Sequence, residues 1–351
     1  MAFLLLFEDA VENQEFISKG ISHHSRDAIP VEVFSGDTDV PTGLTYEQFI
    51  ERQYLERSAD IGLIVCDQEL GLYSKLPGLS ANAVGVVARN LGIPFCQYSQ
   101  HPKANQREIN RFRKLQRWNA EEITLTEARN DWAREISELW NGFEQLRAGY
   151  KDTNVNTLKP AAALAKLMGR SDATSRIALY GSGDQAVMTE IFGFVDSSSQ
   201  VQRMPRILGM WLRLSLLRFH GLLVNGTAAA SYLNISVADF DRVEVRKEFA
   251  SAKYDGPFGG LSEWWWRSDL ESQLLEAEKG DGRSMLHGRG VEVAECLDAE
   301  SGERAGYYCM ITESPVSRSN SKGNINWFPS GADLARIRSS KFDEITSLVS
   351  M

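Results

Sequence analysis

The sequence predicts an α/β protein in two parts: a doubly wound, five-stranded parallel sheet of strand order 2-1-3-4-5, and then a mainly helical α+β module that includes a β-hairpin. Over residues 3–146, short apolar runs alternate with longer helical patterns, which is typical of a parallel sheet covered by helices on both faces. The alternation stops at a polar stretch, and 351 residues are enough for two domains. We therefore expect a domain at 1–149, a linker at 150–160 and a C-terminal module at 161–351.

The strands of the first domain are predicted from short apolar runs bounded by polar or turn-forming residues. These runs lie at residues 3–7, 31–34, 61–66, 94–98 and 123–125. Because crossovers between parallel strands are right-handed, only a few strand orders are available to such a chain. The flavodoxin-like order 2-1-3-4-5 is one of them, and it places a ligand site beyond the carboxyl ends of the first and third strands.

The helices between these strands are predicted at residues 13–22, 46–58, 80–91, 106–118 and 130–146. The third has recognisable ends, because Ser80 stands at the N-cap position and Gly92 follows its last apolar position.

Beyond the linker the sequence no longer alternates between strands and helices. Helices are expected at residues 160–168, 205–223 and 264–279, and two short helices about Asn234 within residues 228–249. A strand is expected at 176–180, and a hairpin of two strands at 291–296 and 307–312.

Composition narrows the class of protein. No apolar run reaches the 18 residues of a transmembrane helix, and the apolar start of the chain lacks the basic flank of a signal peptide. We therefore expect a cytoplasmic protein with no membrane contact. The net charge of −9 makes nucleic acid an unlikely partner, since affinity for nucleic acid rests on neutralising phosphates. The four cysteines form no Cys-x-x-Cys pair, so free thiols are expected.

The candidate site is a group of carboxylates at the carboxyl ends of two strands. Glu8 and Asp9 follow the first predicted strand, and Asp67 follows the third. The parallel order brings all three to one edge of the sheet. Converging carboxylates of this kind can hold Mg²⁺ in an octahedral oxygen shell, and one aspartate could then attack a phosphoryl donor.

These residues resemble the site of response-regulator receiver domains, and the resemblance covers residues 1–146. Glu8 and Asp9 match the family's acidic pair, Asp67 matches its phosphoacceptor, and Ser99 matches the Ser or Thr at the end of its fourth strand. The resemblance implies a Mg²⁺ cofactor, phosphorylation of Asp67 by a sensor kinase, and a place in a two-component phosphorelay.

One departure from the family bears on that chemistry. The family carries a lysine at the end of its fifth strand, where this chain has Thr126 or Glu127. Without that cation the site holds a dianionic phosphoryl group less well, and a glutamate would oppose it. Lys75 and Lys103 are the candidates to replace the cation. We therefore expect weak Mg²⁺ binding and a domain deficient in phosphorylation.

Three consecutive tryptophans, Trp264, Trp265 and Trp266, are the most unusual feature of the second half. On the predicted helix 264–279 successive side chains point about 100° apart, so the three cannot share one core. Large aromatic residues beside an arginine are typical of interface anchors. We expect at least one of the three to anchor an interface, between the two domains or between two copies of the chain.

Two weaker motifs leave alternatives open. Residues 181–186 match a G-x-G-x-x-A phosphate loop, although no second parallel strand follows. Residues 225–236 resemble the core of a helix-turn-helix, with Asn234 in the turn and Ser236 capping a second helix that is mostly acidic.

The sequence thus favours a cytoplasmic signalling protein in which a receiver-like domain controls a C-terminal interaction or effector module through a protein partner or self-association. The alternatives are an enzyme, hydrolase or nucleotide-processing, with its active site in the C-terminal half, and a DNA-binding response regulator.

Overall fold

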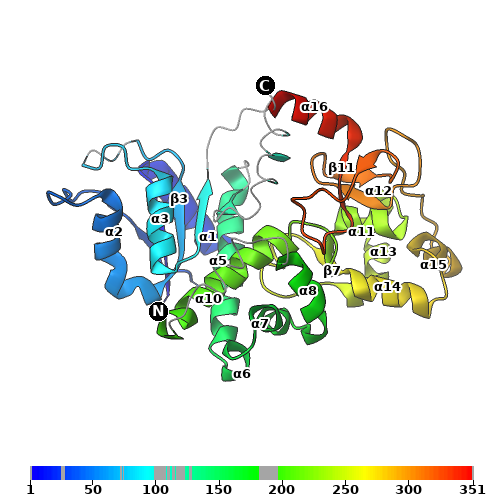
Figure 1. Cartoon of the computed structure of the whole chain (residues 1–351), viewed down its shortest axis with the longest axis horizontal. Coiled ribbons are helices and arrows are strands. Elements are labelled where there is room, and N and C mark those ends of the chain that lie inside the picture. The colour runs from blue at the N-terminus through cyan, green and yellow to red at the C-terminus, as the bar shows by residue number, and fades with distance from the viewer. Residues whose placement is uncertain are drawn as a thin grey trace. The chain divides into compact units, whose positions relative to one another are not determined.

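A computed structural model describes residues 2–349 except 25–27, 72, 74, 99–107, 109–110, 113–114, 116–122, 126–128 and 182–196. The chain divides into two compact units (Figure 1). The N-terminal unit comprises Met1–Lys103, Ala120–Ala163 and Glu190–Met210. The C-terminal unit comprises Ala104–Asn119, Leu164–Thr189 and Trp211–Met351. Each unit is therefore assembled from three separate stretches of the chain.

The N-terminal unit is built on a parallel sheet of order β2-β1-β3-β4, which confirms the predicted α/β class. Its strands are β1 (Phe3–Phe7), β2 (Val31–Val33), β3 (Ile61–Asp67) and β4 (Phe95–Tyr98). All residues of β1 and β3 are buried, as expected where helices cover both faces of a parallel sheet. Two residues, β5 (Ile123–Thr124), pair in parallel with the outer side of β4.

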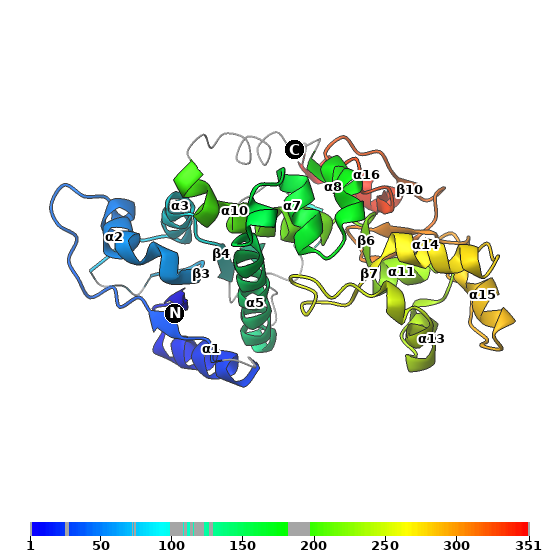
Figure 2. The ribbon, with the colours of Figure 1, turned by 90° about the horizontal axis from the view of Figure 1, so that it is seen from below.

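Two pairs of helices cover this sheet. Helix α1 (Val11–His24) packs against α5 (Trp132–Tyr150), and α2 (Tyr46–Tyr54) packs against α3 (Ala81–Leu91) (Figures 1 and 2). The contact between α1 and α5 is close because Gly20 has no side chain: a Cβ there would lie 2.5 Å from the Cβ of Ala133. The predicted helix at 106–118 falls mostly outside the described residues.

The ends of α2 and α3 follow from their sequences. Thr45 and Gln48 form a capping box at the start of α2. Ser80 accepts a hydrogen bond from the backbone N–H of Ala83, and Gly92 ends α3 with a φ of 70°. Both predicted ends of α3 are confirmed. The predicted helix 46–58 is shorter than expected, because a 3-10 turn replaces it from Leu55 to Asp60.

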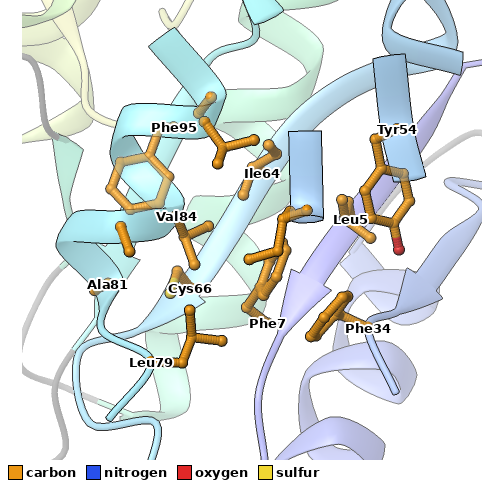
Figure 3. Close-up of a cluster of buried hydrophobic side chains, with 14 of the residues drawn as sticks. Leu5, Phe7, Phe34, Tyr54, Ile64, Cys66, Leu79, Ala81, Val84 and Phe95 are labelled. Carbon is orange, nitrogen blue, oxygen red and sulfur yellow. The ribbon is translucent and has the colours of Figure 1, made fainter. Parts of the chain in front are cut away.

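The core on the α2 and α3 side of the sheet is filled by alternate residues of the strands. Leu5 and Phe7 of β1 and Ile64 and Cys66 of β3 belong to it (Figure 3). The ring of Phe7 stacks on Phe34, with ring centroids 4.6 Å apart. This packing fixes the ends of β1 and β3 at one edge of the sheet.

The predicted linker, residues 150–160, is partly helical. α6 (Thr153–Asn156) begins after Asp152, which caps it, and α7 (Pro160–Leu167) follows. Later in the chain, α10 (Ser197–Trp211) continues directly into a π-helical turn, Leu212–Leu216.

The C-terminal unit contains two small sheets. β6 (Leu223–Asn225) pairs with β7 (Trp264–Trp266) antiparallel. The second sheet has the order β10-β11-β8-β9, in which only the β11–β8 pair is parallel. Its strands are β8 (Tyr307–Cys309), β9 (Ser314–Val316), β10 (Ser321–Lys322) and β11 (Ala335–Arg338). The helices here are α8 (Thr174–Gly181), α11 (Gly226–Leu233), α12 (Val237–Phe240), α13 (Val243–Glu248), α14 (Arg267–Glu276), α15 (Gly282–Gly288) and α16 (Ser339–Val349).

Three sequence predictions for the second half are wrong. The strand expected at 176–180 is part of helix α8, in which Ile177 and Tyr180 are buried while Leu179 is exposed, the spacing of a helix. The helix expected at 264–279 begins only at Arg267, because the tryptophans form β7. Residues 291–296 form no strand, and β8 pairs instead with β9 and β11.

Candidate functional site

The carboxylates at the ends of β1 and β3 lie at one edge of the sheet, as predicted. Because β1 and β3 are parallel neighbours with Phe7 opposite Cys66, the residues that follow these two positions share that edge. Glu8 is completely buried and Asp67 is 5% exposed. Asp9 is half-buried. Ser99, the fourth predicted site residue, lies outside the described residues.

The carboxylate of Glu8 is already engaged by two donors. One oxygen, Oε1, accepts from the backbone N–H of Ala10 at 2.8 Å, and Oε2 accepts from the hydroxyl of Tyr98. Tyr98 is the last residue of β4, and it lies directly opposite Asp67 in the pairing with β3. Its ring packs on Trp132 with ring centroids 4.4 Å apart. Burial and the charge of Glu8 raise the pKa of Tyr98. Its hydroxyl therefore stays protonated and donates the hydrogen bond to Glu8.

A second tyrosine, Tyr73, contacts the backbone at the same edge of the sheet. The hydroxyl of Tyr73 is within hydrogen-bonding distance of two backbone carbonyls, those of Glu8 at 3.1 Å and Phe34 at 3.2 Å. Its ring lies against Gly36, which has a φ of 62° and where a Cβ would come within 2.4 Å of the ring. The side chain of Gln14 also donates to the Glu8 carbonyl, at 2.7 Å. The chain around Glu8 is therefore held on several sides.

Asp67 has a different environment. Its Oδ1 accepts one backbone N–H, from Glu69 at 3.1 Å. Burial raises the pKa of Asp67 to about 6, with a smaller contribution from the charges of Glu8, Asp9 and Glu69 and against the lowering effect of the Glu69 N–H. This is a carboxylate held among other carboxylates.

Lys75, one of the two candidates to replace the family lysine, pairs with Asp39 at 3.6 Å. Lys103, Thr126 and Glu127 lie outside the described residues.

The arrangement does not fit a Mg²⁺ site as it stands. Both oxygens of Glu8 and one oxygen of Asp67 already accept hydrogen bonds. Within the part of the chain that the structure describes, no group of three or more His, Cys, Asp or Glu side chains is placed to hold a metal ion.

Tyr98 and Tyr73 are the site residues that the sequence reasoning missed. Tyr98 directly precedes Ser99 at the end of a strand that was predicted to reach the site. Its position in the sequence could therefore have identified it as a site residue. Tyr73 lies in a long loop, and nothing in its spacing predicts the contact with Glu8.

The three tryptophans lie in β7 and all are buried, with exposures of 6%, 2% and 4%. Their partners belong to the same unit. Trp264 stacks on His220, Trp265 meets Phe240, and Trp266 meets Tyr254 and the guanidinium of Arg170. An anchor for a second copy needs an exposed ring, and none of these three rings is exposed. The interface role remains a prediction.

The structure contains the turn and the N-cap that the helix-turn-helix resemblance predicts. Asn234 ends α11 with a φ of 58°, and Ser236 accepts from the backbone N–H of Asp239 at 3.1 Å. The second helix is interrupted, however, as α12 and α13. Arg242 between them pairs with Asp239 and Glu244. In the glycine-loop motif, residues 182–186 lie outside the described residues.

The four cysteines are free and buried. In the described part of the chain, no helix has the length and apolar character needed to cross a membrane.

Comparison with known proteins gives no family for this chain. No protein-family model matches the sequence, and no curated protein matches it significantly.

Proposed function

We propose that this chain is a signalling protein whose N-terminal domain is a receiver-like domain, with the flavodoxin-like strand order 2-1-3-4-5, that acts without stable phosphorylation. The observation that carries the proposal is the hydrogen bond from Tyr98 to the buried carboxylate of Glu8. In a phosphorylated receiver, the residue matching Glu8 would help to hold Mg²⁺; here that carboxylate is used to fix β4 to β1.

The surroundings of Asp67 support the same reading. Transfer of a phosphoryl group to an aspartate needs positive charge to offset the phosphoryl oxygens. Here the titratable neighbours that raise the pKa of Asp67 are carboxylates, and Lys75 is engaged by Asp39. A phosphoryl group on Asp67 would therefore meet repulsion, and Mg²⁺ would have to displace Tyr98 to reach both oxygens of Glu8. We expect weak Mg²⁺ binding and slow, short-lived phosphorylation.

A domain of this kind signals through contacts rather than through the phosphoryl group. We propose that a protein partner or a second copy of the chain binds the N-terminal domain, and that the C-terminal unit delivers the output. The DNA-binding alternative is less favoured, because Arg242, which lies between α12 and α13, is paired with Asp239 and Glu244.

The test is phosphorylation of the purified full-length chain by a small phosphodonor with Mg²⁺, followed by intact mass. We expect little or no stable adduct on the wild-type protein and none on Asp67→Asn. In Tyr98→Phe, which frees one oxygen of Glu8, we expect tighter Mg²⁺ binding. Rapid, stoichiometric and stable phosphorylation of the wild-type protein at Asp67 would overturn the proposal.

A further inference from the structure

Arg336 of β11 is a half-buried cation of the C-terminal unit. Within the part of the chain that the structure describes, no Asp or Glu side chain pairs with it; its printed partners are the two oxygens of Ser321. Arg338, two residues further along the same strand, pairs by contrast with Asp298 and Glu300. Since a charge that is partly withdrawn from water is costly without a counter-charge, Arg336 is a candidate for binding an anion from solution.

The guanidinium of Arg336 is held in one orientation. Its Nε donates to the hydroxyl of Ser321 at 2.6 Å, and its Nη2 donates to the Ser321 carbonyl at 3.0 Å. The Ser321 hydroxyl spends its own proton on the Ser317 carbonyl at 2.6 Å. The guanidinium carbon lies 4.7 Å from the centroid of the Tyr307 ring, and Gly323 packs so closely that a Cβ there would lie 2.3 Å from Nη1.

These contacts leave one edge of the Arg336 guanidinium free to bind a ligand. Ser321 takes the N–H of Nε and one N–H of Nη2, which share one side of the planar group. Nη1 has no hydrogen-bond partner among the described residues and is not a buried atom. One N–H of Nη1 and the second N–H of Nη2 are parallel, which is the fork that binds two oxygens of a carboxylate or phosphate group.

A second arginine adds positive charge beside this edge. Arg318 is exposed and precedes Ser321 by three residues, in the loop that leads into β10. No carboxylate pairs with Arg318 in the described ranges of the chain. Burial lowers the pKa of Arg336, and so does the charge of Arg318, whereas Tyr307 raises it. The two guanidinium groups are therefore near enough to repel each other, and an anion bound at the free edge would offset that repulsion.

We propose that Arg336, with Arg318 beside it, binds the phosphate group of a small ligand at the surface of the C-terminal unit, either free phosphate or a phosphate ester. Phosphate fits because two of its oxygens match the parallel N–H groups of Arg336, and its second negative charge matches the second guanidinium. Ser321 and Tyr307 fix the fork before the ligand arrives, which lowers the entropy lost on binding.

This site is independent of the proposed receiver-like function, because it uses no residue of the N-terminal unit. Failure of the phosphate site would leave the proposal for Glu8 and Asp67 untouched, and the reverse also holds.

The first experiment is calorimetric titration of the full-length chain with inorganic phosphate, acetate and adenosine monophosphate at equal ionic strength. Phosphate is expected to bind more tightly than acetate, since acetate carries a single charge. Tighter binding of the nucleotide than of phosphate identifies an ester as the ligand, and equal or weaker binding identifies free phosphate. If acetate binds as tightly as phosphate, or if no phosphate compound binds, the proposal is wrong.

Variants locate the bound anion. Arg336→Gln is expected to weaken phosphate binding about tenfold or more, because it removes charged hydrogen bonds. Arg318→Gln is expected to weaken it about threefold, since an exposed charge is screened. Lys322→Gln is the matched control: Lys322 is exposed, and it pairs with Ile337, so it lies on the face of the sheet opposite Arg336. Its affinity for phosphate should stay that of the wild-type protein.

Arg336→Lys separates the fork from the charge, because lysine keeps the charge and loses the two parallel N–H groups. It is expected to weaken phosphate binding nearly as much as Arg336→Gln, and it carries the test together with Arg318→Gln if the glutamine variant at 336 fails to fold. Unchanged phosphate affinity in both would refute the proposal. An equal loss in Lys322→Gln and Arg318→Gln would show attraction by overall charge only, and would refute it as well.

Discussion

The guanidinium of Arg338 donates to Oδ1 of Asp298 at 2.7 Å, with the two side chains only 4% and 0% exposed. Asp298 also accepts the backbone N–H of Glu300 at 3.0 Å and that of Ser317 at 2.9 Å. These donors, together with Asn320 and Arg338, lower the pKa of Asp298 against the effect of burial. A single carboxylate thereby connects β11 with the loops on both sides of β8 and β9.

Breaking this ion pair is therefore expected to be costly. Asp298→Ala leaves the buried Arg338 with only the half-exposed carboxylate of Glu300, 3.2 Å away, as counter-charge. It also leaves two backbone N–H groups without this acceptor. We expect a loss of about 3–5 kcal/mol in the free energy of unfolding, measured by urea denaturation. As a control, Glu244→Ala removes one partner of the half-exposed Arg242 and should cost less than about 1 kcal/mol. Similar costs for the two variants would contradict this prediction.

Tyr98→Phe tests the hydrogen bond at the sheet edge. The change keeps the ring against Trp132 and removes only the donor to Glu8. A hydrogen bond to a charged group contributes about 1.5–3 kcal/mol, and we expect a loss of this size at pH 7. Tyr46→Phe removes a hydroxyl bonded to the Pro77 carbonyl near the surface and serves as the matched control, with an expected loss of about 1 kcal/mol or less. Equal losses in the two variants would mean that the Glu8 contact has no special weight.

Two of the buried titratable groups, His220 and Asp67, predict pH effects of opposite sign. Burial lowers the pKa of His220 to about 3, below its ordinary value of about 6.5. Between pH 6.5 and 3 the unfolded chain binds the extra proton, so His220 makes the protein less stable as the pH falls through this range. As the pH is lowered from 6.5, the Tm of His220→Phe should fall less steeply than that of the wild-type protein. The Tm of His287→Gln, changed at an exposed histidine, should fall as steeply as that of the wild-type protein.

Asp67 acts in the other direction. Its pKa is raised to about 6, so the folded protein holds the proton between pH 6 and its ordinary pKa of about 3.9. Stability from this group is present at low pH and is lost as the pH rises through 6. Asp67→Asn should therefore raise the Tm at pH 8 more than at pH 4. A Tm that is lower at pH 8 than that of the wild-type protein would show that the ionised carboxylate is stabilised in the fold.

The tryptophan run gives a prediction about stability. Trp265 is 2% exposed and packs edge-on against Phe240. Trp265→Ala should cost about 3–5 kcal/mol, with the mass in solution unchanged by light scattering. Val243→Ala, at a side chain that is 67% exposed, is the control and should change stability by about 0.5 kcal/mol or less. A change in mass with unaltered stability would favour the interface role instead.

The sequence was most informative where one local pattern decides the outcome. β1 and β3 are continuous apolar runs because both faces of the sheet are covered. Ser80 marks the start of α3 through its side-chain hydroxyl, and Gly92 marks the end through its left-handed backbone. The parallel order then brought Glu8 and Asp67 to one edge. The contacts of Tyr98 and Tyr73 with Glu8 depend on distances between residues far apart in the chain, which no local pattern encodes.

Short apolar runs in the second half were ambiguous for a different reason. A run of three or four apolar residues fits a buried strand and a buried helix equally well. Ile177 to Tyr180 therefore read as a strand and is helical, whereas Trp264 to Trp266 read as a helix and is a strand. In both cases the partners that decide the outcome, Gly331 for Tyr180 and β6 for the tryptophans, lie elsewhere in the chain.

The discontinuous make-up of the N-terminal unit bears on how the chain is synthesised. Arg203 donates to the Asn90 carbonyl at 3.0 Å, and Gly209 leaves room for the ring of Phe143, where a Cβ would lie 2.3 Å away. Both contacts need residues beyond 200. When only the first 150 residues have left the ribosome, all strands of the parallel sheet are present. The residues beyond 200 that complete the same unit have not yet been synthesised. A nascent-chain series should accordingly become resistant to protease only after residue 210 has left the exit tunnel.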